Sequence, residues 1–235
     1  TQELDKIFTS WKKRNTKLLK DLKKDFKPRQ IITIISEDLL KSYAGESLID
    51  KYDVYQHLMT YWNDTMQDDC YLIAANGWKA ELTNINTGKK EIILDSDLVP
   101  KTLVIDRFFK VDKKAIEQLE VKRETLTSQI DEMTEEHSAE EGFFAAMDKV
   151  SKATVAKRLK EIKGDKKASD EIKVLEAWLN LVEEQATLKK EIDISIAELD
   201  KKVIARYKTL TEDEIKTLVV DDKWMTTIER NIKTE

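Results

Sequence analysis

The hydrophobic residues at the start of the chain recur at helical spacing. Between residues 2 and 26 the apolar residues Leu4, Phe8, Trp11, Leu18, Leu22 and Phe26 are three, four or seven positions apart and so lie on one helical face, which predicts an amphipathic helix. Pro28 interrupts this pattern and can occupy the first turn of a second helix, in which an apolar residue repeats every four positions up to Tyr43. The isoleucine-rich run 31–35 leaves a strand as the alternative there. Gly45 fits the end of this helix.

A third helix is predicted over residues 50–67, after which the pattern changes. Short apolar runs at 70–75, 78–83 and 91–94 are separated by turn residues, Asn76-Gly77 and the segment 84–88. Asn-Gly between two apolar runs is typical of a β-hairpin. The sequence therefore predicts a three-stranded antiparallel meander that packs against the first three helices. The apolar connector at 98–109 is expected to join the same core.

From residue 112 the apolar positions step by three and four, as in a coiled coil. One seam comprises Ile116, Leu119, Arg123, Leu126, Ile130, Met133 and His137, and the other comprises Ile172, Leu175, Leu179, Val182 and Ala186. After Ala186 the phase slips, and Leu188, Ile192, Ile196, Leu199 and Val203 continue the stripe. We expect one long antiparallel helical hairpin within the chain, with intermolecular pairing as the alternative. Its second helix, 168–207, would extend as an arm on the order of 60 Å long.

Capping residues mark the shorter helices. Ser138 with Glu141, and then Ser151, predict two short tip helices within 139–163. Thr211 with Glu214 predicts a final helix that runs through Trp224. The expected fold is mainly α with a small antiparallel β meander, amphipathic helices and a long coiled-coil-like hairpin. The expected parts are residues 1–111, the hairpin 112–208 and the C-terminal helix 209–235.

The amino-acid composition excludes several classes of protein for this chain. Charged residues make up 37% of the chain, whereas it has 5 Gly and 2 Pro, which favours long solvated helices. The single cysteine, Cys70, excludes an internal disulfide and fits a reducing compartment, and two distant histidines do not supply a zinc site. With no apolar run of about 18 residues and no signal peptide, we expect a cytoplasmic protein without a membrane anchor. Because the chain opens at Thr1 inside a helical pattern, we expect a piece of a longer protein.

Two segments carry an excess of basic residues on an otherwise acidic chain. Residues 1–29 hold ten Lys/Arg and four Asp/Glu, and residues 149–167 hold eight and two. Such segments can bind a polyanion, and a solvated helix face is the alternative. The candidates for contact with DNA are Lys12, Lys13, Arg14, Lys157, Arg158 and Lys160. The last three lie on the second member of a helix-turn-helix-like segment, 143–163, which either reads DNA or closes the hairpin tip.

Other residues are weaker candidates. The carboxylates Asp64, Asp68 and Asp69 suggest metal or acid–base chemistry, with a solvated helix end as the alternative, and His57 is expected to be a core or hydrogen-bonding residue. Because of the phase slip, Ile192, Ile194 and Ile196 cannot all face the same neighbouring helix. Covering the remaining face would need another subunit or the first three helices. The candidates for this partner interface are Ile192, Ile194, Ile196 and Trp224.

Several strings in the chain resemble a known family. They are KYDVYQHLMTYWNDTMQDDCYLIAANGWK at 51–79, ISE at 35–37, DLVPK at 97–101, RFF at 107–109, AKRLKEIK at 156–163 and LTEDEIKTLVVDDKW at 210–224. Taken in their order along the chain, these strings resemble the C-terminal part of the modification (M) subunit of type I restriction–modification systems. The resemblance implies a parent protein that methylates adenine in DNA with S-adenosylmethionine.

The resemblance also implies partners and a role. Two M subunits, one specificity subunit and added restriction subunits would form the complex that binds DNA, and this chain would be its scaffold and coupling region. The chain lacks the family's glycine-rich turn and, with Pro28 and Pro100 as its only prolines, its Asn-Pro-Pro-aromatic motif. We therefore expect no cofactor in this fragment and no methylation by it alone. The alternative is a stand-alone helical-hairpin interaction protein.

Overall fold

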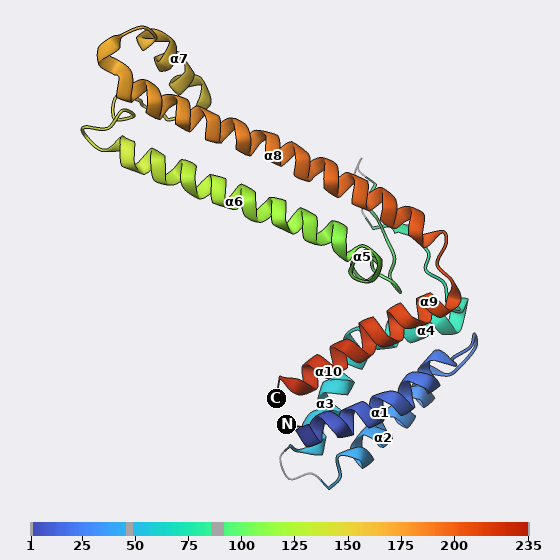
Figure 1. Ribbon diagram of the computed structural model, residues 1–235. Helices are drawn as coiled ribbons and strands as arrows, with labels where there is room; N and C mark the ends of the chain where they lie inside the picture. Colours follow the sequence, from blue (N-terminus) through green and yellow to red (C-terminus); the bar gives the residue numbers. More distant parts are fainter. Residues whose placement is uncertain (1, 46–48, 86–91, 235) are drawn as a thin grey trace. The chain divides into compact units, whose positions relative to one another are not determined.

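The computed structural model describes residues 2–45, 49–85 and 92–234 (Figure 1). These residues are mainly α-helical and include a small antiparallel sheet, which confirms the expected fold class. The chain divides into two compact units. The first comprises Thr1–Phe108 and Lys202–Glu235, and the second comprises Phe109–Lys201. Residues 209–235, expected as a separate part, thus fold together with the N-terminal segment.

The first two helices are α1 (Gln2–Lys20) and α2 (Pro28–Ser42). Helix α1 ends earlier than residue 26 because the chain turns after Lys20, where Asp25 takes a positive φ of 68° and donates its N–H to the carbonyl of Ala74. Pro28 opens α2 as predicted. The strand alternative for 31–35 is wrong, because Ile31, Ile35 and Leu39 are buried on one helical face.

The next three elements are contiguous along the chain: α3 (Lys51–Tyr61), the π-helical η1 (Trp62–Met66) and α4 (Gln67–Asn76). The predicted strand at 70–75 is therefore wrong. Met66, Cys70 and Ile73 are all fully buried, and their spacing of four and three matches a helix. Gly77, with φ of 77°, caps α4 by donating its N–H to Ile73 and does not form a hairpin turn.

Among the residues that the structure describes, the sheet has two short strands, where three were predicted. Strand β1 (Thr83–Asn84) pairs antiparallel with β2 (Leu94–Asp95), with Thr83 opposite Asp95. Part of the predicted turn at 84–88, and the first residue of the predicted strand at 91–94, lie outside the described residues. Because these strands are exposed or half-buried, the core of the first unit lies between its helices.

The connector and the C-terminal segment complete the first unit. Leu98 and Val99 are buried ahead of α5 (Lys101–Phe108), as expected for an apolar connector. The C-terminal elements are α9 (Glu212–Lys216), π-helical η3 (Thr217–Met225) and α10 (Thr226–Lys233). The capping box of Thr211 and Glu214 is confirmed. Element η3 contacts α1 and α5, and α10 contacts α3, so the two ends of the chain share one core.

Large aromatic side chains fill this core, and the indole N–H groups of Trp11, Trp78 and Trp224 donate hydrogen bonds within it. Trp11 and Trp224 are fully buried. The indole N–H of Trp11 donates to the carbonyl of Ile35 at 3.1 Å, and that of Trp78 donates to the carbonyl of Leu22 at 2.7 Å. A buried indole without an acceptor would cost free energy, so these bonds fix how α1 and the turn that follows it pack against their neighbours.

The second unit is the predicted intrachain hairpin. Helix α6 (Lys110–Ser138) packs against α8 (Ser169–Tyr207), whose last residues belong to the first unit. Leu126, Leu188 and Ile192 form a buried cluster between them. Gln185 donates to Thr127, and Trp178 donates to Thr134. Since residue numbers rise on α6 as they fall on α8, the helices are antiparallel.

The phase slip in α8 occurs where the sequence indicated it. Ala186 is exposed, and the half-buried Gln185 occupies the seam between Val182 and Leu188. Two successive steps of three at this point shift the hydrophobic stripe around the helix. Two details differ. Ala186 was predicted in the seam and is exposed, and Trp178, more than Leu179, is buried there.

One of the two predicted tip helices is present. Helix α7 (Lys152–Ile162) begins with a capping box of Ser151 and Thr154 and is followed by a short 3-10 turn, η2 (Lys166–Ala168). The expected helix after Ser138 is wrong, because residues 139–150 form turns. There the backbone approaches so closely that a Cβ at Gly142 would lie 2.1 Å from the carbonyl oxygen of His137. A buried cluster closes the tip: Phe144, Val155, Ile162, Leu175 and Trp178.

Candidate functional site

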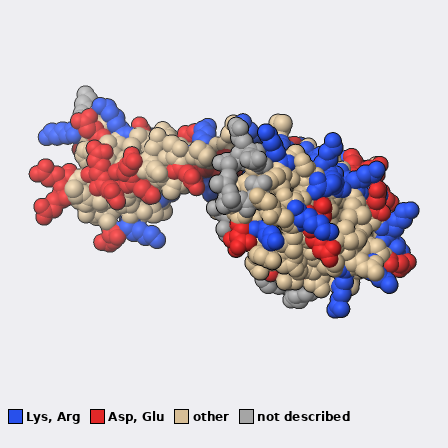
Figure 2. All heavy atoms as spheres, turned by 90° about the horizontal axis from the view of Figure 1, so that it is seen from below, with Lys and Arg blue, Asp and Glu red and all other residues tan. Residues whose placement is uncertain are grey.

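The two basic segments lie on different units. Residues 1–29 belong to the first unit and residues 149–167 belong to the second. Figure 2 shows Lys and Arg side chains spread over one face of the first unit, with acidic side chains between them. A basic side chain that is already paired inside the chain is less available to a phosphate. The ion pairs therefore decide which of these residues can bind an anion.

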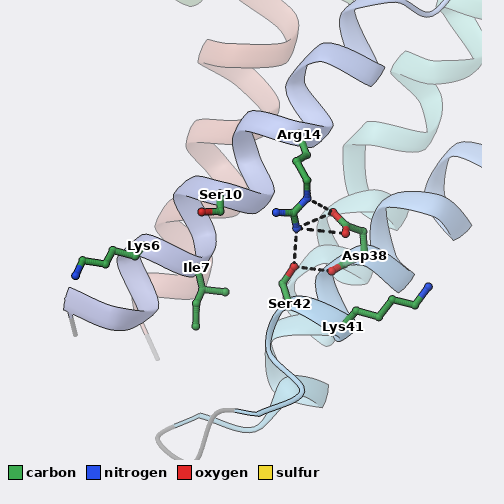
Figure 3. A pocket seen from close by; sticks show the side chains of 7 residues that line it. All are labelled: Lys6, Ile7, Ser10, Arg14, Asp38, Lys41 and Ser42. Atoms are coloured by element: carbon green, nitrogen blue, oxygen red, sulfur yellow. Dashed lines mark hydrogen bonds and ion pairs between the residues drawn. The ribbon is translucent and has the colours of Figure 1, made fainter.

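Lys12 and Arg14 are paired within the first unit. The Nζ atom of Lys12 lies 2.8 Å from a carboxylate oxygen of Glu229, which links α1 to α10. The guanidinium group of Arg14 donates to Asp38 at 3.2 Å and to the hydroxyl of Ser42 at 2.9 Å, as Figure 3 shows. These two basic residues, which the sequence nominated for DNA contact, connect helices within the first unit.

The pair of Arg14 and Asp38 lies in a surface groove between α1 and α2. The groove has a volume of about 460 Å³. The amino groups of Lys6 and Lys41 extend away from the pair (Figure 3). Because Asp38 neutralises Arg14, the centre of this groove offers little net charge to an anion.

The free positive charge of α1 lies on its outward face. Lys6, Lys13 and Lys17 are exposed, and none forms an ion pair with a residue that the structure describes. At 100° per residue their directions fall within about 40° of one another, opposite the buried Trp11. Sequence reasoning nominated Lys13 but missed Lys6 and Lys17. Their spacing of seven and four residues was the signal that would have found them.

The basic residues of the tip are partly paired. The guanidinium group of Arg158 donates to both carboxylate oxygens of Glu171, at 2.7 and 3.2 Å. Lys157 lies 4.0 Å from Glu161, a weak exposed pair, and Lys160 is exposed. The helix-turn-helix interpretation is wrong, because residues 143–150 do not form a helix. The apolar residues of this segment close the tip of the hairpin.

The tip also carries a groove of about 590 Å³. Phe143 and Met147 supply apolar surface to it, and Lys149 and Lys157 supply positive charge. Glu161 and Glu171 line the same groove. Their carboxylates offset these cations, so the groove is not a concentrated anion site.

The four candidates for a partner interface separate into two groups. Ile192 is buried in the hairpin seam and Trp224 is buried in the first unit, with 2% and 0% of their surfaces exposed. The prediction of a partner interface is wrong for these two residues, because a partner cannot reach a buried side chain. Ile194 and Ile196 are 59% and 47% exposed. As they lie two residues apart on a helix, they point to different sides of α8.

A buried polar centre joins α4 to η3. The carboxylate oxygens of Asp69 accept hydrogen bonds from Lys223 and from the indole N–H of Trp224, each at 2.8 Å. The amino group of Lys223 also donates to the carbonyl oxygens of Asp97 and Leu98 at 3.2 Å. Sequence reasoning expected Asp69 at a solvated helix end, and it is 3% exposed. The missed signal is its place on the helical face of Cys70 and Ile73.

The environment of Asp69 opposes its charge. Burial raises the pKa of Asp69, while Lys223 and Trp224 act in the opposite direction. The neighbouring Asp64 and Asp68 are exposed, although the helix continues through them and does not end there, and they line a surface pocket of about 570 Å³ with Lys223. Every donor of the centre faces an acceptor within the chain. We therefore assign Asp69 a structural role.

Two further side chains, those of His57 and Cys70, carry groups that could take part in catalysis. His57 is half-buried on α3. The thiol of Cys70 is buried, and burial raises its pKa, which makes it a poor nucleophile. Within the described part of the chain, no group of three or more His, Cys, Asp or Glu residues is arranged to hold a metal ion. Among the same residues, no helix combines the length and apolar character that crossing a membrane requires.

These features define a helical protein whose candidate sites are charged and apolar surfaces. No family model, no curated protein and no solved structure matches the chain. The residue strings and the surfaces just described are therefore the features that bear on function.

Proposed function

We propose that this chain is the C-terminal assembly region of the M subunit of a type I restriction–modification system. In this role it would couple the adenine-methylating module of the parent protein to the specificity subunit. The second M subunit and the restriction subunits would be further partners, and DNA would bind to the complex. The observation that carries the proposal is the order of the residue strings, of which 51–79 is the longest.

Two structural features support an assembly role. The hairpin of α6 and α8 is a long, thin element with its own apolar seam, and it leaves Ile194 exposed on α8. An exposed isoleucine on a rigid helix is a suitable contact for a helix of another subunit. The S-adenosylmethionine of the parent protein would bind outside this chain, which lacks the family's glycine-rich turn. The proposed location is the cytoplasm, which suits the reduced, buried Cys70.

The test is co-purification of the intact M subunit with the specificity subunit. Ile194→Glu places a charge on the proposed contact, and we expect recovery of the specificity subunit to fall at least tenfold. The matched control is Val121→Glu, which changes an apolar residue that is 62% exposed on α6. Circular dichroism would verify that both variants are folded.

Two outcomes would count against the proposal. If unmodified M subunit fails to recover the specificity subunit, the assembly role is wrong. If Ile194→Glu and Val121→Glu behave like the unmodified protein, the contact does not involve this face of α8. The second candidate function is a stand-alone interaction protein, which the self-sufficient hairpin seam favours. An in-frame Asn-Pro-Pro-aromatic motif upstream of Thr1 in the parent gene would exclude it.

A further inference from the structure

We propose that the outward face of α1 is a binding site for the phosphate backbone of double-stranded DNA. The site consists of Lys6, Lys13 and Lys17, and the proposal deepens the assembly function above, on which its biological setting rests. The chemistry is sequence-independent neutralisation of phosphates by lysine ammonium groups.

The three lysines are the residues of α1 that remain available to a ligand. Asp38, Glu229 and Asp221 occupy the other basic residues of α1 within the first unit, which are Lys12, Arg14 and Lys20. Lys6, Lys13 and Lys17 are exposed and make no ion pair with any residue that the structure describes. The fold thus separates the basic residues of one helix into structural residues and free residues.

The spacing of the free lysines suits an extended polyanion. At 1.5 Å per residue, Lys6 and Lys13 lie about 10 Å apart along the axis of α1, and Lys13 and Lys17 lie about 6 Å apart. Each DNA strand carries one phosphate per about 3.4 Å of duplex axis. A helix lying along one strand would therefore bring each lysine within reach of a different phosphate.

The positive surface continues beyond the C-terminal end of α1. Lys23, Lys24 and Lys27 are exposed in the turn before α2 and form no ion pair with a described residue. Asp21 and Asp25 are the acidic residues of this turn. The surplus of free lysines extends the attraction for phosphate past Lys17.

The side chains on this face suit neither the recognition of base edges nor insertion into a membrane. Arginine is the side chain that most often binds guanine edges, and Asp38 and Ser42 occupy Arg14. Between Lys6 and Lys13 the face carries Ser10, whereas a helix that lies in a membrane surface needs large apolar residues beside its lysines. A phosphate backbone therefore fits this surface better than a base edge or a lipid interior.

The test measures the salt dependence of binding to a fluorescent 30-base-pair duplex by anisotropy, with the chain of residues 1–235. Replacing Lys6, Lys13 and Lys17 by Gln removes three phosphate contacts. The slope of log affinity against log salt should then decrease in magnitude by about 2.7, since each contact contributes about 0.9. Arginine at the same three positions should preserve the slope.

The matched control replaces Lys189, Lys190 and Lys201 by Gln. These lysines are exposed on α8, so the control makes the same change in net charge away from α1. We expect its slope to equal that of the unmodified chain. An unchanged slope in the α1 variant, or equal decreases in both variants, would overturn the assignment. Binding to duplexes of unrelated sequence should be the same.

Two further measurements separate this inference from its alternatives. If the chain binds vesicles of anionic lipid as tightly as DNA, and the α1 variant loses both, the face is a general anion surface and the DNA assignment is wrong. Recovery of the specificity subunit by the α1 variant of the intact M subunit should remain normal. Failure of the unmodified protein to recover that subunit would reject the proposed function, while the DNA measurement would still test the lysine face.

Discussion

The first unit and the hairpin bury different kinds of side chain. In the first unit Trp11 and Trp224 are inaccessible to solvent and donate hydrogen bonds to groups on other helices. In the middle of the hairpin the buried residues are Leu126, Leu188 and Ile192, between two helices whose other faces are solvated. A two-helix seam has little depth, so it buries a narrow apolar stripe. A multi-helix core can enclose aromatic rings and a charged centre.

This difference determines how each unit responds to a substitution. The first unit joins residues that are more than a hundred positions apart, as in the bond between Asp69 and Lys223. The loss of one such contact should affect the whole unit. The hairpin is continuous in sequence, and its contacts are repeated along α6 and α8. A defect in the seam should stay within the hairpin.

The largest effect is expected from Asp69→Ala. Removing the buried carboxylate leaves the half-buried amino group of Lys223 without its counter-ion and leaves the buried indole N–H of Trp224 without an acceptor. Breaking a buried pair in this way typically costs about 3–5 kcal/mol. Urea unfolding followed by tryptophan fluorescence measures it. The control Asp68→Ala, at an exposed position beside it, should change the free energy of unfolding by less than about 0.5 kcal/mol. If the two substitutions lower the free energy of unfolding equally, the polar centre around Asp69 contributes nothing to stability.

A smaller and more local effect is expected from Leu126→Asp. The new carboxylate would be buried against Leu188 and Ile192 without a partner, at a cost of about 2–4 kcal/mol. Hydrogen exchange of the backbone amides should accelerate in α6 and α8 and remain slow in α1 and α2. The control Val121→Asp, at an exposed position of α6, should leave exchange unchanged. An unaltered melting temperature for Leu126→Asp would contradict the packed seam.

The smallest effect is expected from Glu214→Gln. The backbone N–H of Thr211 and the guanidinium group of Arg206 lower the pKa of Glu214 below its ordinary value of 4.5. This carboxylate therefore stabilises the fold above that value, and the stabilisation is lost as the pH falls through the lowered pKa. The variant should be less stable by a few tenths of a kcal/mol at pH 7, as is usual for exposed pairs.

The difference between Glu214→Gln and the unmodified chain should shrink as the pH falls below 4.5 and vanish once the pH has passed below the lowered pKa of Glu214. Thermal unfolding over a series of pH values measures it. Asp213→Asn, in the same helical turn but outside the capping box, is the control. If the two variants show the same dependence on pH, the helix dipole rather than the capping box explains the effect.

Local chemistry determined much of this fold. The heptad steps of α6 and α8, the capping boxes at Ser151 and Thr211, and Pro28 at the start of α2 each involve residues within one or two turns. Helical periodicity and capping depend on neighbouring residues, so the sequence predicted these elements. The phase slip near Ala186 was predictable for the same reason.

Where local signals were ambiguous, tertiary packing determined which secondary structure formed. Asn76-Gly77 suits a hairpin and also a helix end, and the burial of Cys70 and Ile73 among distant helices favoured the helix. The same packing placed Asp69 in the core, since its partners Lys223 and Trp224 come from the other end of the chain.

The candidate sites divide in the same way. The sequence by itself determined the basic excess of residues 1–29 and the run of alternating isoleucines on α8, of which the structure buries Ile192 and exposes Ile194 and Ile196. Only the tertiary structure decided which charges are free, because Glu229 and Asp38 neutralise Lys12 and Arg14 and leave Lys13 available. An ion pair depends on where two helices meet in space, and local spacing along one helix carries no information about that.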